Sequence, residues 1–434
     1  MKRKMIFAIV SLALVIMAMG IGGCGNGNSG DRQTDMQSSS TQVSVDQDEA
    51  GSSDSSESDA SLPSGTNAQE SSSEVTPTVE ETPEPAFESD RSEAFELLSN
   101  ITIGWNLGNT FDAHGAGNSL ASETYWGCPK TTQEMFDALS AQGFNAVRIP
   151  VTYAEHVGKA PDYKINEDWL NRVQEVVDYA IKDDMYVILD THHETDFWLV
   201  TDEKHEAAAI EELSAIWKQV AEHFKDYDEH LIFEGMNEPR RKGSDAEWNG
   251  GTKKERVIVN NLNQAFVDTV RSVGGNNENR LLIICTYGNN PSKEAVEDLK
   301  IPHDNHIAVA VHMYTPYHFT YDSKDQWEYS TWDGSKKTEI ATIAKQLENL
   351  LTNNDVPVIV TEFGAVNKNN SEEVIKWIED FLRIMRVRNM KCFWWDNNCY
   401  DTNGENFGIF NRRTLEFFDQ NIADALVLNA TMEN

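Results

Sequence analysis

The chain has 434 residues, of which 36 are Lys or Arg and 71 are Asp or Glu, so its formal net charge at pH 7 is −35. A chain this acidic offers no basic stripe that could neutralise phosphates, which excludes nucleic acid as its partner. Three segments of different character follow one another along the sequence.

Residues 1–24 have the composition of an export signal. Lys2-Arg3-Lys4 precedes an apolar run from Met5 to Met19, and small residues then lead to Cys24. A run this short between a basic start and small residues is typical of a secretory signal and not of a spanning helix. The end of the segment resembles the lipobox of bacterial lipoproteins, which implies a lipidated Cys24 and an anchor at the cell surface. The alternative is an ordinary signal peptide and a secreted protein.

Residues 25–88 consist of Ser, Thr, Asp, Glu, Gln, Gly and Pro with almost no apolar residues, and Arg32 is their only base. Such a segment cannot bury enough apolar surface to offset the entropy cost of ordering it. We therefore predict a disordered acidic linker. It would hold the third segment away from the membrane, whose only contact with the protein would be the lipid anchor.

Residues 89–434 alternate short apolar runs with amphipathic stretches, as expected for βα units. The predicted strands are Ile101–Leu107, Ala146–Val151, Tyr186–Asp190, Leu231–Gly235, Leu281–Thr286, Ile307–His312, Pro357–Thr361 and Lys391–Trp395. The predicted helices are Thr132–Gln142, Glu167–Lys182, Ala207–Phe224, Lys253–Val273, Ser292–Leu299, Lys336–Leu351 and Ser371–Arg388. Thr131 with Glu134 predicts a capping box for the first of these helices. Eight units favour a (β/α)8 TIM barrel, although periodicity alone also permits a doubly wound sheet.

The cysteines of this third segment, Cys128, Cys285, Cys392 and Cys399, form no CxxC pair and no zinc spacing. Oxidation of Cys392 with Cys399 is open for an exported protein, whereas Cys285 lies within a strand and is expected to be a buried thiol. His192-His193-Glu194 is followed by Phe197, so the HExxH zinc motif is absent, and we predict no metal site.

Polar residues gather where the predicted strands end. They are Asn106, Asn109, Arg148, His192, His193, Asn237, Glu238, His312, Tyr314, Glu362, Trp395, Asp396 and Asn397. In a barrel these ends meet at one rim, where active sites of this fold lie. A single glutamate at a strand end is usually solvated or salt-bridged, but so many polar residues at matching ends are hard to explain by packing.

Glu238 after the fourth strand and Glu362 at the seventh predict glycoside hydrolysis, which uses two carboxyl groups across the scissile bond. One must be protonated and the other ionised, so their surroundings must separate the two pKa values. Arg148 and Tyr314 are placed to keep Glu362 ionised. Glu234 lies deeper in its strand and is predicted to be a structural, hydrogen-bonded carboxylate.

Seven motifs in chain order then resemble glycoside hydrolase family 5. They are GWNLGNTFDA (104–113), FNAVRIPVTY (144–153), ILDTHHE (188–194), IFEGMNEPR (232–240), VHMYTP (311–316), VTEFG (360–364) and FWWDN (393–397). The resemblance begins near residue 95 and reaches the C-terminus. Its detail is similar to the subfamily of endo-β-1,4-glucanases, xyloglucanases and mixed-linkage glucanases. Cys128 departs from the pattern, which has Asn there, so sugar contacts near Trp126 are expected to differ.

The resemblance implies a retaining enzyme with Glu238 as acid/base, Glu362 as nucleophile and the two carboxyl groups about 5 Å apart. Arg148, His192, Asn237, His312 and Tyr314 would support these two residues. Trp395 would stack under a sugar ring, and Asn109, Trp126, His193 and Asn397 would contact substrate. No cofactor is implied, because the chemistry needs only acids and water.

Two other functions remain open from the sequence. A non-catalytic surface lipoprotein that binds polysaccharide would keep Trp126 and Trp395 but would not need both glutamates. A barrel enzyme for phosphorylated metabolites would need a Gly-rich phosphate loop, which EFGAVNKNN (362–370) does not supply. Among hydrolases the choice between cellulose, lichenan, xyloglucan, xylan and mannan depends on loop contacts, and we expect a monomer.

Overall fold

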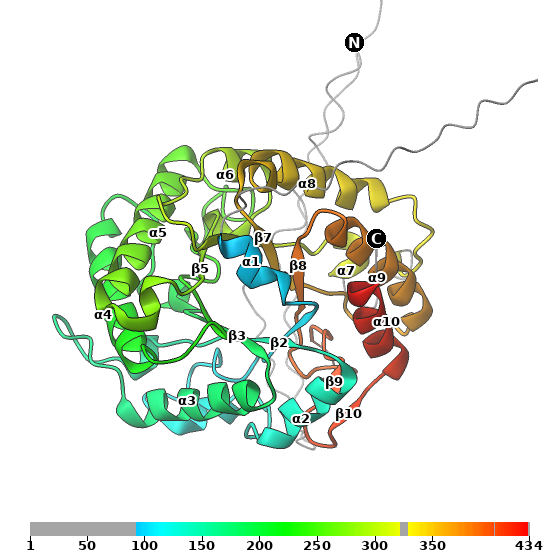
Figure 1. Ribbon diagram of the computed structural model, residues 1–434, viewed down its shortest axis with the longest axis horizontal. Helices are drawn as coiled ribbons and strands as arrows, with labels where there is room; N and C mark the ends of the chain where they lie inside the picture. The colour runs from blue at the N-terminus through cyan, green and yellow to red at the C-terminus, as the bar shows by residue number, and fades with distance from the viewer. Residues whose placement is uncertain (1–92, 322–328, 403, 433–434) are drawn as a thin grey trace, which may run out of the picture. The chain divides into compact units, whose positions relative to one another are not determined.

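The computed structural model describes residues 93–321, 329–402 and 404–432. The predicted export signal with Cys24 and the acidic linker lie outside the described residues. Eight parallel strands close into a barrel in the order β1 to β8, with helices around them (Figure 1). The prediction of a (β/α)8 TIM barrel is therefore confirmed. The doubly wound sheet is wrong, since β1 pairs with both β2 and β8.

All eight strands lie within or beside the apolar runs predicted from the sequence, because parallel barrel strands are buried on both faces. Their bounds are β1 Gly104–Asn106, β2 Ala146–Ile149, β3 Tyr186–Asp190, β4 Leu231–Glu234, β5 Leu282–Cys285, β6 Ile307–His312, β7 Val358–Phe363 and β8 Lys391–Trp394. Seven of these strands are buried along their whole length, and β8 is buried after its first residue. β1 is shorter than predicted, whereas β7 continues for two residues beyond Thr361.

Seven α-helices correspond to the predicted amphipathic stretches. They are α2 Gln133–Gln142, α3 Glu167–Lys182, α4 Glu206–His223, α5 Lys253–Val273, α6 Lys293–Glu297, α8 Lys337–Leu350 and α9 Ser371–Arg386. The capping box predicted at Thr131 is wrong, because α2 begins one residue later with Thr132 as its N-cap and without a side-chain cap bond. A capping box is instead present at α5, between Thr252 and Glu255.

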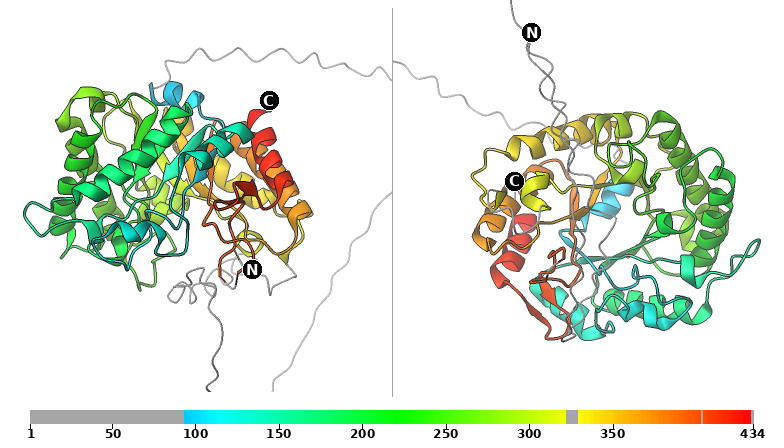
Figure 2. Two further views of the ribbon diagram at one scale, coloured as in Figure 1. Left: turned by 90° about the horizontal axis from the view of Figure 1, so that it is seen from below. Right: turned by 180° about the vertical axis from the view of Figure 1, so that it is seen from behind.

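Short elements close the two ends of the barrel. Helix α1 (Glu93–Ser99) buries Ala94, Phe95 and Leu98 and lies across the centre of the ring in Figure 1. The amide of Ala94 donates to the carbonyl of Asn305, just before β6, which places α1 at the N-terminal end of the strands. Figure 2 shows the segment after β8, with the hairpin of β9 (Phe410–Asn411) and β10 (Glu416–Phe417), toward the opposite end.

Besides α1, two α-helices of the described residues were not predicted from the sequence. They are α7 (Tyr317–Thr320), which follows β6, and α10 (Gln420–Thr431), which lies beside α9 (Figure 1). No helix of the described part of the chain is both long and apolar enough to cross a membrane.

The register of the barrel is irregular where its polar residues lie. The pairing of β6 with β7 shifts between Val311 and His312, so that His312 stands opposite Glu362. The pairing of β7 with β8 shifts between Val360 and Phe363. Such irregularities re-aim side chains beside active sites. They direct His312 and Glu362 toward the C-terminal mouth of the barrel.

Candidate active site

Arg148 on β2 is the centre of a buried charge network at the mouth of the barrel. Its Nη1 lies 2.9 Å from Oε1 of Glu362, and its Nη2 lies 2.8 Å from Oδ1 of Asn237. Its Nε is 2.6 Å from Oε2 of Glu234, and Nη2 is also 2.6 Å from Oδ2 of Asp190. Glu234 is fully buried, as expected for the structural carboxylate predicted from the sequence. The three carboxylates keep Arg148 charged although it is completely buried, because their charges raise its pKa.

Glu362 lies within β7 and is held by two donors. Arg148 donates to Oε1, and the hydroxyl of Tyr314 donates to Oε2 over 2.9 Å. Its side chain is only 8% exposed. Burial raises the pKa of Glu362, and nearby Glu238 raises it further, while His312, Arg148 and Tyr314 act in the opposite direction.

Glu238 follows β4 and is more open, with a side chain that is 20% exposed. Its Oε1 lies 2.9 Å from Nδ1 of His312, and its Oε2 lies 3.3 Å from Nη1 of Arg240. Burial opposes ionisation, yet the hydrogen bond from His312 and the charge of Arg240 lower the pKa of Glu238 to about 2.

The two pKa values are therefore separated in the reverse direction from that expected for an acid at position 238. The physical reason is that His312 donates a hydrogen bond to Glu238 and Arg240 places positive charge beside it. The two glutamates in turn raise the pKa of His312, although its burial acts against protonation. These shifts favour an ionised Glu238 that accepts a hydrogen bond from His312.

The two predicted carboxylates lie close enough to act on one bond. An oxygen of Glu238, a ring nitrogen of His312 and an oxygen of Glu362 lie within 4.8 Å of one another. A separation of about 5–5.5 Å between carboxyl groups is typical of retaining glycosidases, whereas inverting enzymes need about 6.5–9.5 Å. The closeness of the two carboxylates matches the retaining geometry.

Asn289 is a buried residue of this site that was not identified from the sequence. Its amide Nδ2 lies 3.1 Å from Nε2 of His312 and also donates to the carbonyl oxygen of Asn237. Because an amide NH2 can only donate, Nε2 must accept, and the neutral imidazole then carries its proton on Nδ1, facing Glu238. Asn289 follows β5, so the same strand-end rule that selected the other residues would have found it.

The aromatic residues predicted to bind sugar lie on one side of the mouth. The ring of Trp395 is parallel to that of His192, with centroids 5.6 Å apart. Trp126 and His193 contact each other and His114, which also packs against Phe197. The exposed ring of Phe197 and the half-buried Trp126 leave aromatic surface open to a ligand. Sequence reasoning did not select His114 or Phe197.

The remaining predicted contacts differ in their surroundings. Asn109 adopts a left-handed backbone with φ 57°, and its side chain is half-buried. Asn397 is buried, and its amide group bonds the backbone of Glu405 and Cys399 within its own loop. That pairing is structural, and a sugar contact at Asn397 stays a prediction.

His192 and His193 lie beside a buried carboxylate that offers a second grouping of potential metal ligands. Within the described residues, single ligand atoms of Asp112, His192 and His193 lie within 4.8 Å of one another. Asp112 already accepts the amides of Asn109 and Thr110, and His192 Nδ1 lies 2.8 Å from Asp190. These protein contacts account for the grouping without an ion, and the prediction of no metal site stays a prediction.

Cys128, the departure noted in the sequence, is buried with its sulfur 3.5 Å from Nη1 of Arg412. Cys285 is a buried thiol, as predicted. Cys392 is a free buried thiol as well, so it does not form a disulfide with Cys399.

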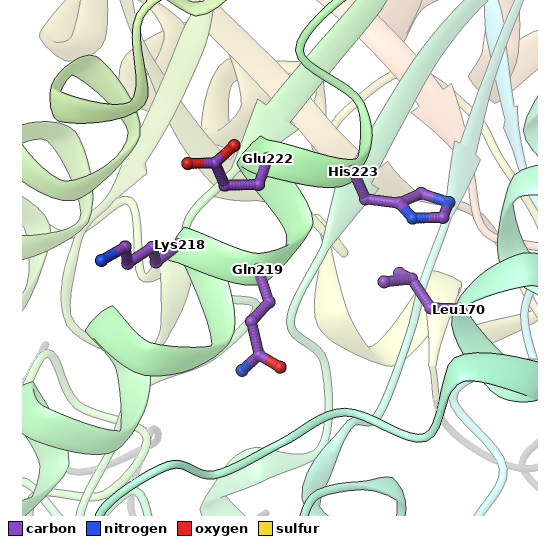
Figure 3. Close-up of a pocket in the computed structure, with 5 residues that line it drawn as sticks. All are labelled: Leu170, Lys218, Gln219, Glu222 and His223. Atoms are coloured by element: carbon purple, nitrogen blue, oxygen red, sulfur yellow. The ribbon is translucent and has the colours of Figure 1, made fainter.

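A shallow depression of about 400 Å³ lies on the outside of the barrel, between α3 and α4. It is lined by Leu170, Lys218, Gln219, Glu222 and His223, and Figure 3 shows that the polar ends of these side chains point in different directions. The polar groups of this depression do not point toward one another as those around Glu238 do, so the barrel mouth is the candidate active site.

A family model described as cellulase, glycosyl hydrolase family 5, matches residues 108–401. This chain belongs to glycosyl hydrolase family 5. Endoglucanase A of Ruminococcus albus is 50% identical over 339 residues, which are 78% of this chain and 93% of that relative. The family resemblance seen in the sequence is thereby confirmed, and the chain is a family 5 enzyme.

Solved structures of family 5 enzymes share this fold. A xyloglucan-specific endo-β-1,4-glucanase from a metagenomic library, solved with cellotriose, is 56% identical, with a TM-score of 0.76 over 78% of this chain and 99% of that one. A broad-specificity endoglucanase from Ruminococcus champanellensis, also with cellotriose, is 44% identical, with a TM-score of 0.75 over 78% and 99% of the two chains.

Proposed function

We propose that this chain is a retaining, endo-acting glycoside hydrolase that cleaves β-1,4-glucosidic bonds in plant cell-wall β-glucans. The observation that carries the proposal is the closeness of Glu238 and Glu362, whose carboxylate oxygens lie within 4.8 Å at the mouth of the barrel. The endoglucanase names of the relatives support the same reaction.

In the first step Glu362 is the nucleophile. One of its oxygens forms a bond to the anomeric carbon while the bond from that carbon to the glycosidic oxygen breaks. Arg148 and Tyr314 hold the attacking carboxylate by the two hydrogen bonds described above. Glu238 gives its proton to the departing oxygen, which leaves as the hydroxyl of a shortened glucan chain.

The proton for this step is one that Glu238 takes up from water. A bound glucan chain removes water from the partly exposed carboxylate, and desolvation raises the pKa of a carboxyl group. Nδ1 of His312 keeps its own proton and lies 2.9 Å from Oε1 of Glu238. Asn289 favours this neutral imidazole, because its amide donates to Nε2.

In the second step the ionised Glu238 acts as a general base. It takes a proton from a water molecule whose oxygen attacks the anomeric carbon, and the bond to Glu362 breaks. Two inversions at one carbon restore the original configuration. The ring of Trp395 would lie under a sugar on the non-reducing side of the cut, with Asn109, Trp126, His193 and Asn397 as further contacts.

Barley β-glucan provides the test of this function. The wild type should release reducing ends, while Glu238→Gln and Glu362→Gln should each lose at least about 99% of the rate, since each removes an essential acid, base or nucleophile. Proton NMR of the first product should show the β-anomer, as retention requires. Equal low release by the wild type and Glu238→Gln, with intact folds, would favour a polysaccharide-binding protein instead.

For the substrate we propose branched and mixed-linkage β-glucans, with xyloglucan among them. The basis is the 56% identity to an enzyme described as xyloglucan-specific and the 44% identity to one described as broad in specificity. Rates on xyloglucan, lichenan, carboxymethyl cellulose, xylan and mannan at equal mass concentration provide the test. Faster turnover of xylan or mannan than of any glucan would overturn this choice.

We also propose that the enzyme is a monomer anchored at the bacterial cell surface through lipidated Cys24. The motif that ends at Cys24 and the acidic linker support this location. Activity should sediment with cell envelopes, and globomycin, which blocks lipoprotein signal cleavage, should cause the precursor to accumulate. Recovery of most activity from the supernatant of intact cells, with Cys24 unmodified, would contradict the anchor.

A further inference from the structure

Arg240 is a cation held directly against the carboxylate of Glu238. Its Nη1 lies 3.3 Å from Oε2 of Glu238 and 3.0 Å from the backbone oxygen of the same residue. Its side chain is only 12% exposed. The carboxylate therefore has a partner at each oxygen, because His312 occupies Oε1.

Two neighbours in the same loop hold Arg240 in this position. Its Nε lies 3.2 Å from Oε1 of Glu247, and the ring of Trp248 lies against the guanidinium with 4.2 Å between its centroid and Cζ. Glu247 is itself fixed, because its Oε2 accepts the amide of Gly243 over 2.6 Å. Such packing is costly for a long flexible side chain, and it leaves the guanidinium oriented before substrate arrives.

We propose that Arg240 is a positioning residue that orients the carboxylate of Glu238 and sets the upper pH limit of hydrolysis. This inference rests on the proposed role of Glu238 as acid/base. Arg240 contacts Oε2 of Glu238, whereas His312 contacts Oε1. A cation at Oε2 stabilises the ionised carboxylate, which favours the general base of the second step over the acid of the first.

Several other titratable side chains lie near Glu238, and substitution of Arg240 leaves them unchanged. They are His192 after β3, His312 on β6, Glu362 on β7, Tyr314 and Tyr321 after β6, and Glu405 after β8. Among residues that contact the Glu238 carboxylate directly in the described part of the chain, Arg240 is the only permanently charged cation, since His312 titrates and Arg148 contacts Glu362.

Arg241 provides a matched control. It is the next residue of the same loop and carries the same charge, but its side chain is 53% exposed and its guanidinium lies 4.0 Å from Glu255, with no ion pair to Glu238. Arg240→Met and Arg241→Met therefore remove the same charge from adjacent positions, and only the first removes it from the acid/base. Arg240→Lys keeps the positive charge but loses the planar guanidinium group.

The experiment measures kcat and kcat/KM on barley β-glucan between pH 4 and 10 for the wild type and the variants. The alkaline limb reports loss of the proton from the acid Glu238, whose titration is coupled to that of His312. Without the cation Glu238 holds its proton more tightly, so in Arg240→Met this limb should move to higher pH by about one unit. The plateau of kcat should fall about tenfold, because the carboxylate is held at one oxygen only. Arg241→Met should keep the wild-type limb, and Arg240→Lys should keep most of it.

Glu247→Gln decides the question if Arg240→Met does not fold. It removes an anion from the guanidinium, so Glu238 experiences more positive charge and the limb should move to lower pH. An unchanged limb in Arg240→Met, or one that Arg241→Met reproduces, would overturn the inference while leaving the proposed function intact. A wild type that releases no reducing ends would overturn the proposed function and the inference with it.

Discussion

Arg148 and Glu234 form a two-pronged ion pair inside the barrel, with Nε 2.6 Å from Oε2 and Nη2 3.2 Å from Oε1, and both side chains are fully buried. The pair lies directly beneath the mouth, where the same guanidinium also reaches Glu362. A structural carboxylate thereby fixes the cation that orients the proposed nucleophile.

Substitutions of Arg148 and of Glu234 are expected to lower the free energy of unfolding by different amounts. Arg148→Met leaves Asp190, Glu234 and Glu362 buried without their cation, and breaking a buried ion pair costs about 3–5 kcal/mol. Glu234→Gln keeps the shape and leaves Arg148 two carboxylate partners, so it should cost about 1–3 kcal/mol. Urea unfolding of both variants checks the order, and equal losses would contradict it. Glu203→Gln removes one partner of an exposed ion pair and serves as the control, with an expected loss of stability near zero.

Asn289 is expected to keep His312 neutral. In Asn289→Asp a carboxylate replaces the donor facing Nε2 of His312, so the imidazolium is stabilised and the pKa of His312 rises. The plateau of kcat should fall at least about tenfold, because the added positive charge of His312 favours the ionised Glu238 over the acid that the first step needs. Nitrogen-15 NMR of the ring reports both the tautomer and the pKa. A wild-type His312 with its neutral proton on Nε2 would contradict the assignment.

Gly108 is expected to be required for the position of Trp395. A Cβ at residue 108 would lie 2.8 Å from the backbone oxygen of Asp396 and 2.9 Å from the Trp395 ring. Gly108→Ala should therefore displace the ring, raise KM for β-glucan severalfold and cost about 1–3 kcal/mol of stability. Gly158→Ala is the control, since its Cβ would meet nothing closer than 3.5 Å. A wild-type KM in Gly108→Ala would contradict this prediction.

The helix caps give a prediction that depends only on stability. Thr252 caps α5 through a complete capping box, so Thr252→Ala should lower the free energy of unfolding by about 1 kcal/mol. Thr132 precedes α2 without a side-chain cap bond, so Thr132→Ala should change the free energy of unfolding by much less. Thermal unfolding of the two variants tests the difference, and equal shifts would argue against the cap at Thr252.

Much of the fold could be predicted because it depends on local patterns. The run Leu231–Glu234 is apolar until its last residue, and parallel strands buried on both faces require such runs. The α3 helix was predicted with its bounds, since a 3.6-residue period over sixteen residues is unambiguous. The four-residue α7 and the two-residue strands of the β9–β10 hairpin were missed, because elements this short show no period.

The sequence by itself determined the eight strands, the polar residues at their ends and the pair Glu238 and Glu362, because strand period and strand ends are encoded locally. Only the tertiary structure decided which groups surround each carboxylate. His312 on β6 and Asn289 after β5 reach the loop of Glu238 only when the barrel closes, whereas Arg240 lies two residues from Glu238 in the same loop. The charge on Glu238 depends on those neighbours through space, since electrostatic energy follows distance between groups and not separation along the chain.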